Sequence, residues 1–573
     1  MVFSSRLPPI DIPNANVVDF VFSERARQVP SADHAAFVDS ASGACVSLGA
    51  LRSLTLRLAA GLRTRCGIAT GDVVAICAAN SIVYPIAAYA VVAAGATCTP
   101  ANPTYTPHEL AHQLANSRCK AVIVGDGLRA TVERALELAQ HTVAHVLLMD
   151  EARFDIDAVE NPEAEDSIFG ILAPADAPAD LFERQAAEPG VDYAQLPAYL
   201  CYSSGTTGKP KGVVLTHRNM VANALQINAV KQLDAPRTPE HDTFLGLAPF
   251  CHAYGLSYVL HSSVSLGGTV VVMAKYSFDA FLAVVQQHRI TYGYLVPPIV
   301  CALSKDPRVD NYDLSTMTTV LSGGAALSPT LIEATEQRLP GVKIVQGYGM
   351  TEMSPAVTML ATTHARPASI GMLMPGCDAI VVDDHGNRLP ENSPGELCFR
   401  GPNIMACYLD NAQATADILD SDHFLHTGDI GYIDSDGFFY ITDRKKELIK
   451  YKGFQVAPSE LEGLLAEHPD VEDAAVMAIY DDNQATEIPR AYIVLKHKAG
   501  DNDDQARAQA VVAWLHQRVA RYKWLRGGFA IIDHIPRSPA GKIIRASIKN
   551  IERASASGTG SGNDSSGATA VLA

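Results

Sequence analysis

The stretch Val73–Pro100, VVAICAANSIVYPIAAYAVVAAGATCTP, decides the fold class of this chain. It lies in a run without Asp, Glu, Lys or Arg that continues to His108. A membrane span would need about 18 consecutive apolar residues, but asparagine, serine, glycine and proline interrupt this run. We therefore expect a buried strand at Val73–Cys77, a buried helix at Ser81–Ala94 and a second strand from Thr97.

Short aliphatic or β-branched segments alternate with helical segments through most of the chain. Further strands are expected at 121–124, 146–149, 213–215, 269–273 and 319–322. Helices are expected at 218–226, 278–288 and 328–338, the last opened by the cap residue Ser328 and by Pro329. Alternation of this kind is typical of α/β architecture with largely parallel sheets.

The pattern changes after about Ile380, where turns rich in Asp, Asn and Gly separate short strands. That spacing predicts an antiparallel subdomain. The charge run Asp443–Lys446 precedes a separate α+β pattern, and we place the domain boundary there. The expected domains are 1–443 and 444–553, followed by a Ser/Gly/Ala-rich tail, 554–573, that we expect to be disordered.

The overall charge argues against a nucleic-acid partner. The 573 residues carry a formal net charge of −17, whereas phosphate backbones are bound by basic faces. Eleven cysteines lie scattered without a Cys-x-x-Cys pair, which favours free thiols in a reducing compartment, here expected to be the cytoplasm. The first residues lack the apolar core of a signal peptide, and no stable membrane span is expected.

The segment Ser203–Gly212, SSGTTGKPKG, has the composition of a phosphate-binding loop. Its glycines, Gly205 among them, let backbone amides turn toward an anion, and Lys211 can neutralise a phosphate. Hydroxyl donors are supplied by Ser203, Ser204, Thr206 and Thr207. A P-loop needs Ser or Thr after its lysine, but Lys209 is followed by Pro210, so a Walker-type ATPase is disfavoured.

This loop resembles the nucleotide signature of the adenylate-forming superfamily, which comprises acyl-CoA synthetases, luciferases and peptide-synthetase adenylation domains. The segment Gly395–Gly401, GELCFRG, is similar to the second signature box of 4-coumarate–CoA ligases, the nearest branch. The resemblance covers nearly the whole chain, from about Ser4 to Lys549. It implies a large N-terminal domain of two doubly wound α/β subdomains plus a small β-barrel-like subdomain, and a smaller, mobile α+β C-terminal domain.

The segment Gln346–Glu352, QGYGMTE, resembles the adenine and magnesium segment of that superfamily. The resemblance implies stacking of Tyr348 on adenine, an α-phosphate contact by Thr351 and coordination of Mg²⁺ by Glu352, a hard oxygen ligand. The other implied nucleotide contacts in this segment are Gln346 and Gly347. Without its register to the phosphate loop, a plain strand-to-loop turn would explain the segment equally well.

Two later motifs resemble parts of the same nucleotide site. Asp429, in His426–Asp429, is the implied ribose anchor, because a carboxylate accepts hydrogen bonds from vicinal hydroxyls. Arg444 is the implied second ribose or phosphate contact. Lys542, near the C-terminus, is the implied adenylation lysine, whose charge stabilises negative charge as pyrophosphate leaves. A flexible exposed loop is the alternative interpretation of the segment around Lys542.

The segment Pro249–Gly255, PFCHAYG, resembles a segment whose histidine faces the acid substrate. On that resemblance His252 orients the carboxylate, and Tyr254 and Tyr258 line the acyl pocket, with core packing as the alternative for both tyrosines. The remaining implied substrate contacts are Gly324, Gly347, Pro355 and Ala356.

The segment Lys446–Gln455, KELIKYKGFQ, resembles the part of the superfamily that serves thioester formation. The implied contacts with AMP or CoA are Lys446, Lys450, Lys452, Gly453 and Gln455, together with Lys275 far upstream. A solvated basic face at a domain edge is the alternative for some of these lysines.

The expected function is ATP-dependent ligation of a carboxylic acid to coenzyme A through acyl-AMP, with Mg²⁺ as the metal ion. The nearest branch implies 4-coumarate or another hydroxycinnamate as the acid, and the expected partner is a small carboxylic acid substrate. The alternatives are a medium-chain fatty acyl-CoA synthetase, a luciferase-like oxygenase and an adenylation module that loads a carrier protein. The expected catalytic residues are Lys542, His252, Glu352 and Thr351.

Overall fold

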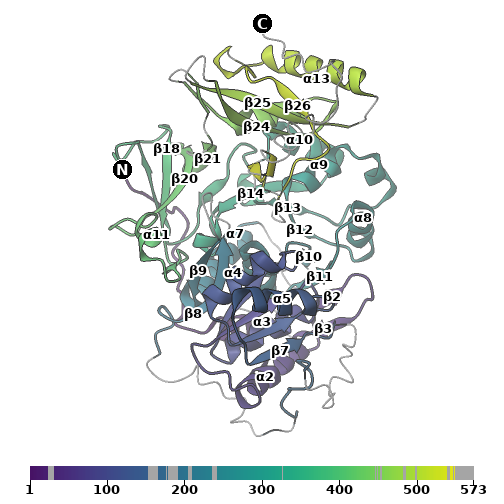
Figure 1. Cartoon of the computed structure of the whole chain (residues 1–573), viewed down its shortest axis with the longest axis vertical. Coiled ribbons are helices and arrows are strands. Elements are labelled where there is room, and N and C mark those ends of the chain that lie inside the picture. The colour runs from purple at the N-terminus through teal and green to yellow at the C-terminus, as the bar shows by residue number, and fades with distance from the viewer. Residues whose placement is uncertain are drawn as a thin grey trace. The chain divides into compact units, whose positions relative to one another are not determined.

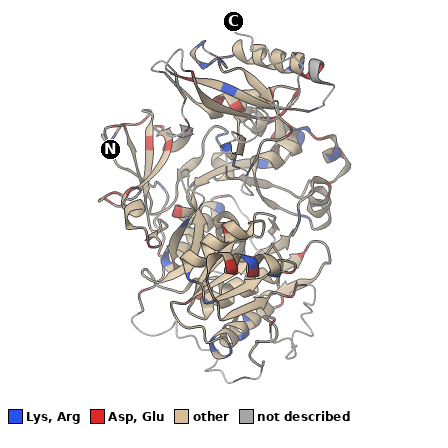
Figure 2. Ribbon diagram, viewed as in Figure 1, with Lys and Arg blue, Asp and Glu red and all other residues tan. Residues whose placement is uncertain are grey.

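The computed structural model of the chain describes residues 1–23, 31–151, 166–175, 177, 191–203, 210–234, 242–324, 327–444, 447, 449–451, 454–481, 486–496, 500–519, 521–537, 542–545 and 547–548 (Figure 1). They form two compact units, Met1–Thr442 and Asp443–Ala573. The predicted tail, 554–573, lies outside the described residues. Basic and acidic residues are interspersed along the ribbon of both units (Figure 2).

The stretch Val73–Pro100 forms the centre of a seven-stranded sheet. Strand β4 (Val73–Cys77) pairs in parallel with β5 (Thr97–Ala101) on one side and with β6 (Ala121–Val124) on the other. Helix α3 (Tyr84–Ala93) connects β4 to β5, and every one of its residues is buried. The sheet is completed by β7 (His145–Leu148), β8 (Pro197–Ser203), β9 (Lys211–Thr216) and β19 (Cys407–Tyr408).

The second sheet changes from parallel to antiparallel part-way across. Its parallel part comprises β14 (Lys343–Gly349), β13 (Thr319–Ser322), β12 (Tyr292–Leu295), β10 (Thr243–Gly246), β11 (Thr269–Val272) and β2 (Ala35–Asp39), with β3 (Cys45–Ser47) antiparallel at the edge. Its antiparallel part comprises β15 (Ala356–Met359), β16 (Gly371–Leu373), β21 (Phe438–Arg444), β20 (Leu425–Ile433), β18 (Gly395–Arg400), β17 (Asp378–Val382) and β1 (Phe3–Ser4). The antiparallel strands predicted after Ile380 therefore extend the parallel sheet across β14.

Buried clusters on alternating strand residues show how these sheets are layered. Val74 and Ile76 face a central cluster shared with the second sheet, whereas Ala75 and Cys77 face the opposite side. The central layer contains α1 (Val17–Phe22), α2 (Leu48–Thr64), α3, α7 (His217–Gln232) and the π-helix η4 (Gly255–Ser263). The outer layers are α4 (Pro107–Ser117) with α5 (Arg129–Ala139) and α8 (Phe278–Gln287) with α9 (Pro297–Lys305) and α10 (Pro329–Arg338).

The predicted α/β class is confirmed, and most predicted elements fall within a few residues of their observed bounds. Helix α7 is longer than predicted and continues to Gln232. It begins at a capping box, in which Thr216 and Asn219 each bond the other's backbone N–H, and its buried polar residues hide the helical period. The remaining short elements of the larger unit are η5 (Pro307–Asn311), η6 (Thr351–Met353), η7 (Thr362–His364) and α11 (Ala412–Ala416).

The smaller unit has the α+β organisation predicted for it. Its sheet has the order β24 (Val471–Asp481), β25 (Thr486–Leu495), β26 (Phe529–Ile531), with an antiparallel and then a parallel pairing. Helices α12 (Pro458–Glu467) and α13 (Asp501–His516) share its main core. The remaining elements are the hairpin β22 (Ile449–Tyr451) and β23 (Phe454–Val456) and the short helix η8 (Arg521–Lys523). Over the described residues of the chain, no helix is both long and apolar enough to cross a membrane.

The buried histidine at the start of α7 makes the larger unit sensitive to acid. His217 Nδ1 accepts a hydrogen bond from the Val17 backbone N–H at 3.1 Å, and burial lowers the pKa of His217 to about 4. The unfolded chain therefore binds more protons than the folded chain between about pH 4 and 6.5. The contribution of His217 to stability is complete above pH 6.5 and falls by about 1.4 kcal/mol per pH unit as the pH drops toward 4.

Replacing His217 by asparagine, whose carbonyl oxygen can accept the same bond, should remove this dependence. We expect the His217→Asn variant to lose roughly 3 kcal/mol less stability than the unchanged chain between pH 6.5 and 4. The measurement is the denaturation midpoint as a function of pH, with the exposed His385→Asn as the control variant. Parallel pH curves for the His217 variant and the unchanged chain would contradict this account.

Candidate nucleotide and acid site

Glu352 joins three segments that are far apart in the sequence. It lies in η6, directly after β14, and its side chain is 3% exposed. Its Oε1 accepts hydrogen bonds from Ser203 Oγ at 2.9 Å and from the Tyr408 hydroxyl at 2.8 Å. The end of β8, the strand β19 and the turn after β14 therefore meet at one carboxylate.

The two ends of the predicted phosphate loop lie beside this carboxylate. Ser203 and Lys211 are paired across the β8–β9 hairpin, and Lys211 Nζ lies 4.7 Å from the centre of the Tyr408 ring. Burial, together with the negative charge of Glu352, raises the pKa of Tyr408, so its hydroxyl stays a neutral donor. The predicted contacts Ser204, Gly205, Thr206 and Thr207 lie outside the described residues.

Asp429 and Tyr348, both predicted to contact the nucleotide, contact each other. The Tyr348 hydroxyl donates a hydrogen bond to Asp429 Oδ2 at 2.6 Å, and only 9% of Asp429 is exposed. The turn that carries Asp429 is held by the Gly428 N–H, which donates to Glu396 Oε1 at 2.9 Å. The Tyr348 ring packs on Phe399, with ring centres 5.9 Å apart. Neighbours on β14 and β18 thus hold the Asp429 carboxylate in place on β20.

His252 lies in a segment fixed by a buried asparagine. Asn80 Oδ1 accepts from the Phe250 N–H at 2.8 Å, and its amide donates to the carbonyls of Ala248 and Gly246. Nδ1 of the half-buried His252 accepts a hydrogen bond from the Tyr254 backbone N–H at 3.2 Å. In the neutral ring this bond places the proton on Nε2, the tautomer that can donate to a carboxylate.

The predicted acyl-pocket residues meet between η4 and the carboxyl ends of β13 and β14. Tyr254 and Tyr258 pack edge to face at 5.1 Å, and the Tyr254 hydroxyl donates to the Leu321 carbonyl at 3.0 Å. A Cβ at Gly347 would lie 3.4 Å from the Tyr258 hydroxyl oxygen, so a larger residue there would press on this ring. Tyr258 is buried and Tyr254 is partly buried, and burial raises the pKa of each, which keeps their hydroxyls protonated.

Several other predicted residues have defined positions around this centre. The buried Gln346 side chain accepts from the Leu327 N–H and donates to the carbonyls of Pro367 and Ser369, so it fixes the backbone beside β14. Gly324 follows β13 with φ +88°, a left-handed conformation that favours glycine. Thr351 is partly buried next to Glu352, Pro355 and Ala356 are buried, and Lys275 is exposed.

The smaller unit carries the predicted lysine Lys542 at the base of a hairpin. Arg537 and Ile543 form a bridge on either side of it, and the Arg537 guanidinium bonds to both oxygens of Asp473 at 2.7 and 3.0 Å. Lys450 and Gln455 are paired across the β22–β23 hairpin, and Arg444 ends β21. The predicted contacts Lys446, Lys452 and Gly453 lie outside the described residues.

The groups in the larger unit fit a nucleotide with its metal ion. Both described hydrogen bonds to Glu352 use Oε1, which leaves Oε2 to bind a cation, and a carboxylate oxygen is the ligand that Mg²⁺ prefers. Asp429 can accept from two sugar hydroxyls, and Lys211 supplies a positive charge for phosphate. These groups lie at the carboxyl ends of β8 and β14 and on β20, the usual edge for ligands in α/β proteins.

Comparison of the sequence with protein families identifies this arrangement. The model of the family described as "AMP-binding enzyme" matches residues 22–409. The chain belongs to the AMP-binding enzyme family. The model described as "AMP-binding enzyme C-terminal domain" matches residues 460–542, within the smaller unit. The resemblance to the adenylate-forming superfamily, with 4-coumarate–CoA ligases as the near branch, is therefore confirmed.

Relatives of this AMP-binding enzyme align over almost its whole length. The 4-coumarate–CoA ligase 5 of Oryza sativa subsp. japonica is 37% identical over 555 residues, which is 96% of this chain and 97% of that protein. The benzoate CoA ligase of Burkholderia xenovorans LB400 superposes with a TM-score of 0.77 at 25% identity, covering 93% and 99% of the two chains. ATP-bound MatB of Rhodopseudomonas palustris gives 0.78 at 25% identity, covering 94% and 99%.

Tyr408 is the residue of this AMP-binding enzyme that sequence reasoning missed. Its two contacts, to Glu352 and to Lys211, join parts of the site that the motifs treat separately. The position depends on pairing of β19 with β9, in which Tyr408 lies opposite Val213. A tyrosine in a short apolar segment gives no local signal of this role, although the cluster of Cys, Tyr and Leu at 407–409 does indicate a buried strand.

The bond between Tyr348 and Asp429 should matter for ATP binding by this AMP-binding enzyme. Tyr348→Phe removes the hydroxyl and leaves the ring, so Asp429, the predicted ribose anchor, loses one charge-assisted bond worth about 1.5–3 kcal/mol. Since about 1.4 kcal/mol corresponds to a tenfold change in affinity, we expect the KM for ATP to rise at least about tenfold, with a smaller change in kcat.

Steady-state kinetics with varied ATP would measure this effect. Tyr440→Phe is the matched control, because the Tyr440 hydroxyl also bonds to an aspartate, Asp434 Oδ2, at 3.0 Å in the same antiparallel strands. An unchanged KM for ATP in Tyr348→Phe would show that Asp429 needs no support from Tyr348.

Proposed function

We propose that this chain is an AMP-forming ligase that joins 4-coumarate, or a closely related hydroxycinnamate, to coenzyme A. Acid–CoA ligase chemistry, with ATP, Mg²⁺ and coenzyme A, follows from the family and from the names of its relatives. The observation that carries the proposal is the bonding of Ser203 and Tyr408 to Glu352, the carboxylate that we propose binds the metal ion. Lys211 lies over the Tyr408 ring and opposite Ser203, so both ends of the phosphate loop lie near this carboxylate.

The first half-reaction requires a carboxylate to attack the α-phosphorus of ATP, with pyrophosphate leaving. Lys211 offsets the repulsion between the two anions, and Asp429 holds the sugar so that the α-phosphate faces the acid. His252, protonated on Nε2, orients the carboxylate oxygen that attacks. Mg²⁺ bound by Glu352 supplies Lewis-acid stabilisation of the phosphate charge. Lys542 stabilises the charge that develops on the leaving pyrophosphate.

The second half-reaction uses other residues of the smaller unit. The CoA sulfur attacks the acyl carbon and AMP leaves, so the acyl–phosphate bond breaks as the thioester bond forms. In this proposal Gly453 and Lys450 lie along the path of the CoA arm, and Lys275 binds its phosphates. Because Lys542 serves the first step and these residues serve the second, we propose that the smaller unit rotates between them about Asp443–Lys445.

The aromatic residues near His252 favour an aromatic acid. Tyr254 and Tyr258 pack together, and both also contact the ring of Tyr294, at 6.2 and 5.7 Å between ring centres. Aromatic rings prefer edge-to-face and offset contacts with other rings, which a cinnamate ring can provide. The branch of 4-coumarate–CoA ligases among the relatives supports the same class of acid.

A matched panel of acids tests the proposal. The kcat/KM for CoA-dependent AMP release would be measured with 4-coumarate, caffeate, cinnamate, benzoate, hexanoate and octanoate. We expect the hydroxycinnamates to exceed the fatty acids by at least about tenfold, equivalent to about 1.4 kcal/mol. Preference for hexanoate or octanoate would replace the proposed acid by a medium-chain fatty acid. If none of the acids in the panel caused AMP release, the ligase activity itself would be contradicted.

A further inference from the structure

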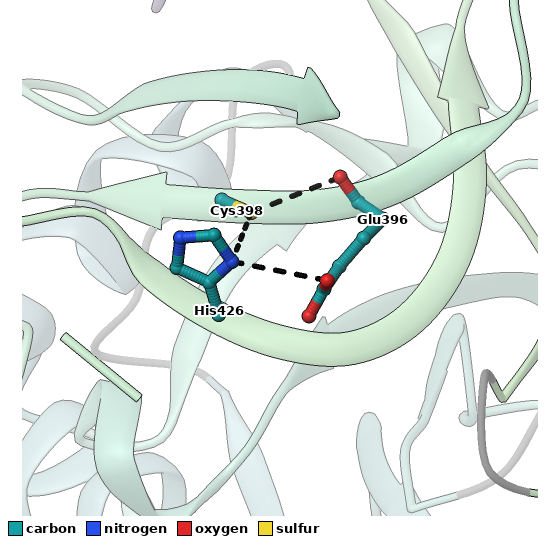
Figure 3. A group of neighbouring side chains, drawn as sticks. All are labelled: Glu396, Cys398 and His426. Carbon is teal, nitrogen blue, oxygen red and sulfur yellow. Dashed lines mark hydrogen bonds and ion pairs between the residues drawn. The ribbon is translucent and has the colours of Figure 1, made fainter. Parts of the chain in front are cut away.

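Three potential metal ligands meet on two paired strands of the larger unit. Glu396 and Cys398 stand two residues apart on β18 and so point to the same face, and Cys398 lies opposite His426 of β20 (Figure 3). Cys398 Sγ lies 3.3 Å from His426 Nδ1, which in turn lies 3.8 Å from Glu396 Oε2. One ligand atom from each residue falls within 4.8 Å of the other two.

We propose that Glu396, Cys398 and His426 form a binding site for a divalent metal ion of the Zn²⁺ class, separate from the Mg²⁺ ligand Glu352. A thiolate, an imidazole and a carboxylate are the ligand set that Zn²⁺ takes, whereas Mg²⁺ and Ca²⁺ prefer oxygen ligands alone. With three protein ligands, the fourth tetrahedral position is taken by water. This site does not depend on which acid the enzyme uses.

The spacing of the three side chains fits such an ion. Bonds of about 2.3 Å to sulfur and about 2.0–2.2 Å to nitrogen and oxygen, at tetrahedral angles, place ligand atoms about 3.3–3.6 Å apart. Two of the three observed distances, 3.3 and 3.8 Å, lie close to that range, and the third is no longer than 4.8 Å, so side-chain rotations can bring all three atoms onto one ion. Cys398 is buried, but about 31% of the His426 side chain is exposed, which gives an ion a route from solvent.

Neighbouring groups hold these ligands in the orientation that metal binding requires. His426 Nε2 lies 3.5 Å from Asp420 Oδ2, so the ring can donate to Asp420 while Nδ1 faces the ion, as in carboxylate–histidine–zinc arrangements. Glu396 uses Oε1 to accept from the Gly428 N–H and keeps Oε2 toward the site. Coordination therefore leaves the turn before Asp429 intact.

Metal binding would cross-link β18 and β20 and so stabilise the folded chain. The Cys398 thiol gives its proton to the buffer as the metal–sulfur bond forms, and neutral His426 and ionised Glu396 bind through their lone pairs. An ion that binds only the folded state raises its stability by mass action, by about 2.7 kcal/mol at a free concentration of 100 times the Kd. Without metal, the three side chains would form only a hydrogen-bonded cluster. Adding metal ions would then cause neither proton release nor stabilisation of the folded chain.

Cobalt(II) can test the site on the full-length chain, reduced and freed of metal by a chelator. We expect one equivalent of Co²⁺ to give the visible bands of a tetrahedral ion together with a thiolate-to-cobalt charge-transfer band. Cys398→Ser should lose the charge-transfer band, whereas the exposed Cys45→Ser should keep it. Zn²⁺ should displace Co²⁺ and should raise the melting temperature of the unchanged chain but not of Cys398→Ser.

A second variant separates metal binding from misfolding of the cysteine variant. Glu396→Gln retains an oxygen that can accept from Gly428 but loses the charge, and we expect it to bind Co²⁺ at least tenfold more weakly while melting normally without metal. A charge-transfer band of equal strength in Cys398→Ser, or equal Co²⁺ affinity in Glu396→Gln, would overturn the proposal. So would the lack of a thiolate band in the unchanged chain.

Discussion

Lys542→Ala should lower the rate of acid-dependent ATP–pyrophosphate exchange by about 100- to 1,000-fold, because it removes about 3–4 kcal/mol of stabilisation from the adenylation step. The described structure holds Lys542 at the base of a hairpin whose stem is closed by the Ile544 N–H and the Pro536 carbonyl, 2.8 Å apart. Arg537, bonded to Asp473, fixes that stem to β24. These bonds hold the backbone next to Lys542, which must be in place before negative charge develops on the leaving pyrophosphate.

The thioester step separates a role in adenylation from general damage. Supplied acyl-AMP should still be converted to acyl-CoA by Lys542→Ala, because other residues serve that step in our proposal. Lys496→Ala is the matched control, since Lys496 is an exposed lysine of the same unit. Full exchange activity in Lys542→Ala would show that another group stabilises the departing pyrophosphate.

Glu352→Gln should reduce kcat/KM for ATP at least about 100-fold, equivalent to about 2.7 kcal/mol, while leaving the fold intact. Glutamine retains a carbonyl oxygen that can accept the hydrogen bonds from Ser203 and Tyr408, so the contact between β8, β19 and η6 is kept. It lacks the negative charge, and its amide group replaces the oxygen expected to bind Mg²⁺. Raising the Mg²⁺ concentration should therefore restore part of the activity.

The control for this variant is Glu336→Gln. Glu336 also has a structural bond, in which Oε1 accepts from the Ile344 N–H at 2.9 Å, but it lies away from the predicted site residues, beside the start of β14. Its kcat/KM should not change. If Glu352→Gln retained normal activity at ordinary Mg²⁺ concentrations, Glu352 would have only its structural role as the acceptor for Ser203 and Tyr408.

The alternating strands and helices of the larger unit could be predicted from the sequence, because elements that are buried on both faces lack charged side chains. The run around Val73–Pro100 becomes two parallel strands and a fully buried helix, as its lack of charged residues predicts. The continuation of the parallel sheet into antiparallel strands could not be read. It depends on β15 turning back against β14, and strand order across a sheet leaves no local pattern.

The candidate site was predictable where one motif supplies a residue and not where two motifs meet. Asp429 and Tyr348 were each expected to contact the nucleotide, but the 2.6 Å bond between them follows only from the packing of β14 against the antiparallel strands. The contacts of Tyr408 and the Cys398–His426 pair could not be predicted either, because each depends on the register of two strands. Gln346 carries a clear motif signal, yet its side chain is taken up by three backbone bonds.

In the proposed reaction, the carboxylate oxygen of the acid attacks the α-phosphorus of ATP. The most direct measurement uses 4-coumarate labelled with ¹⁸O in its carboxyl group, with mass spectrometry of the AMP, pyrophosphate and phosphate formed in the presence of CoA. Attack at the α-phosphorus transfers one labelled oxygen to AMP and none to pyrophosphate, and this is the predicted result. Label in phosphate or pyrophosphate, with unlabelled AMP, would show that the acid does not attack the α-phosphorus.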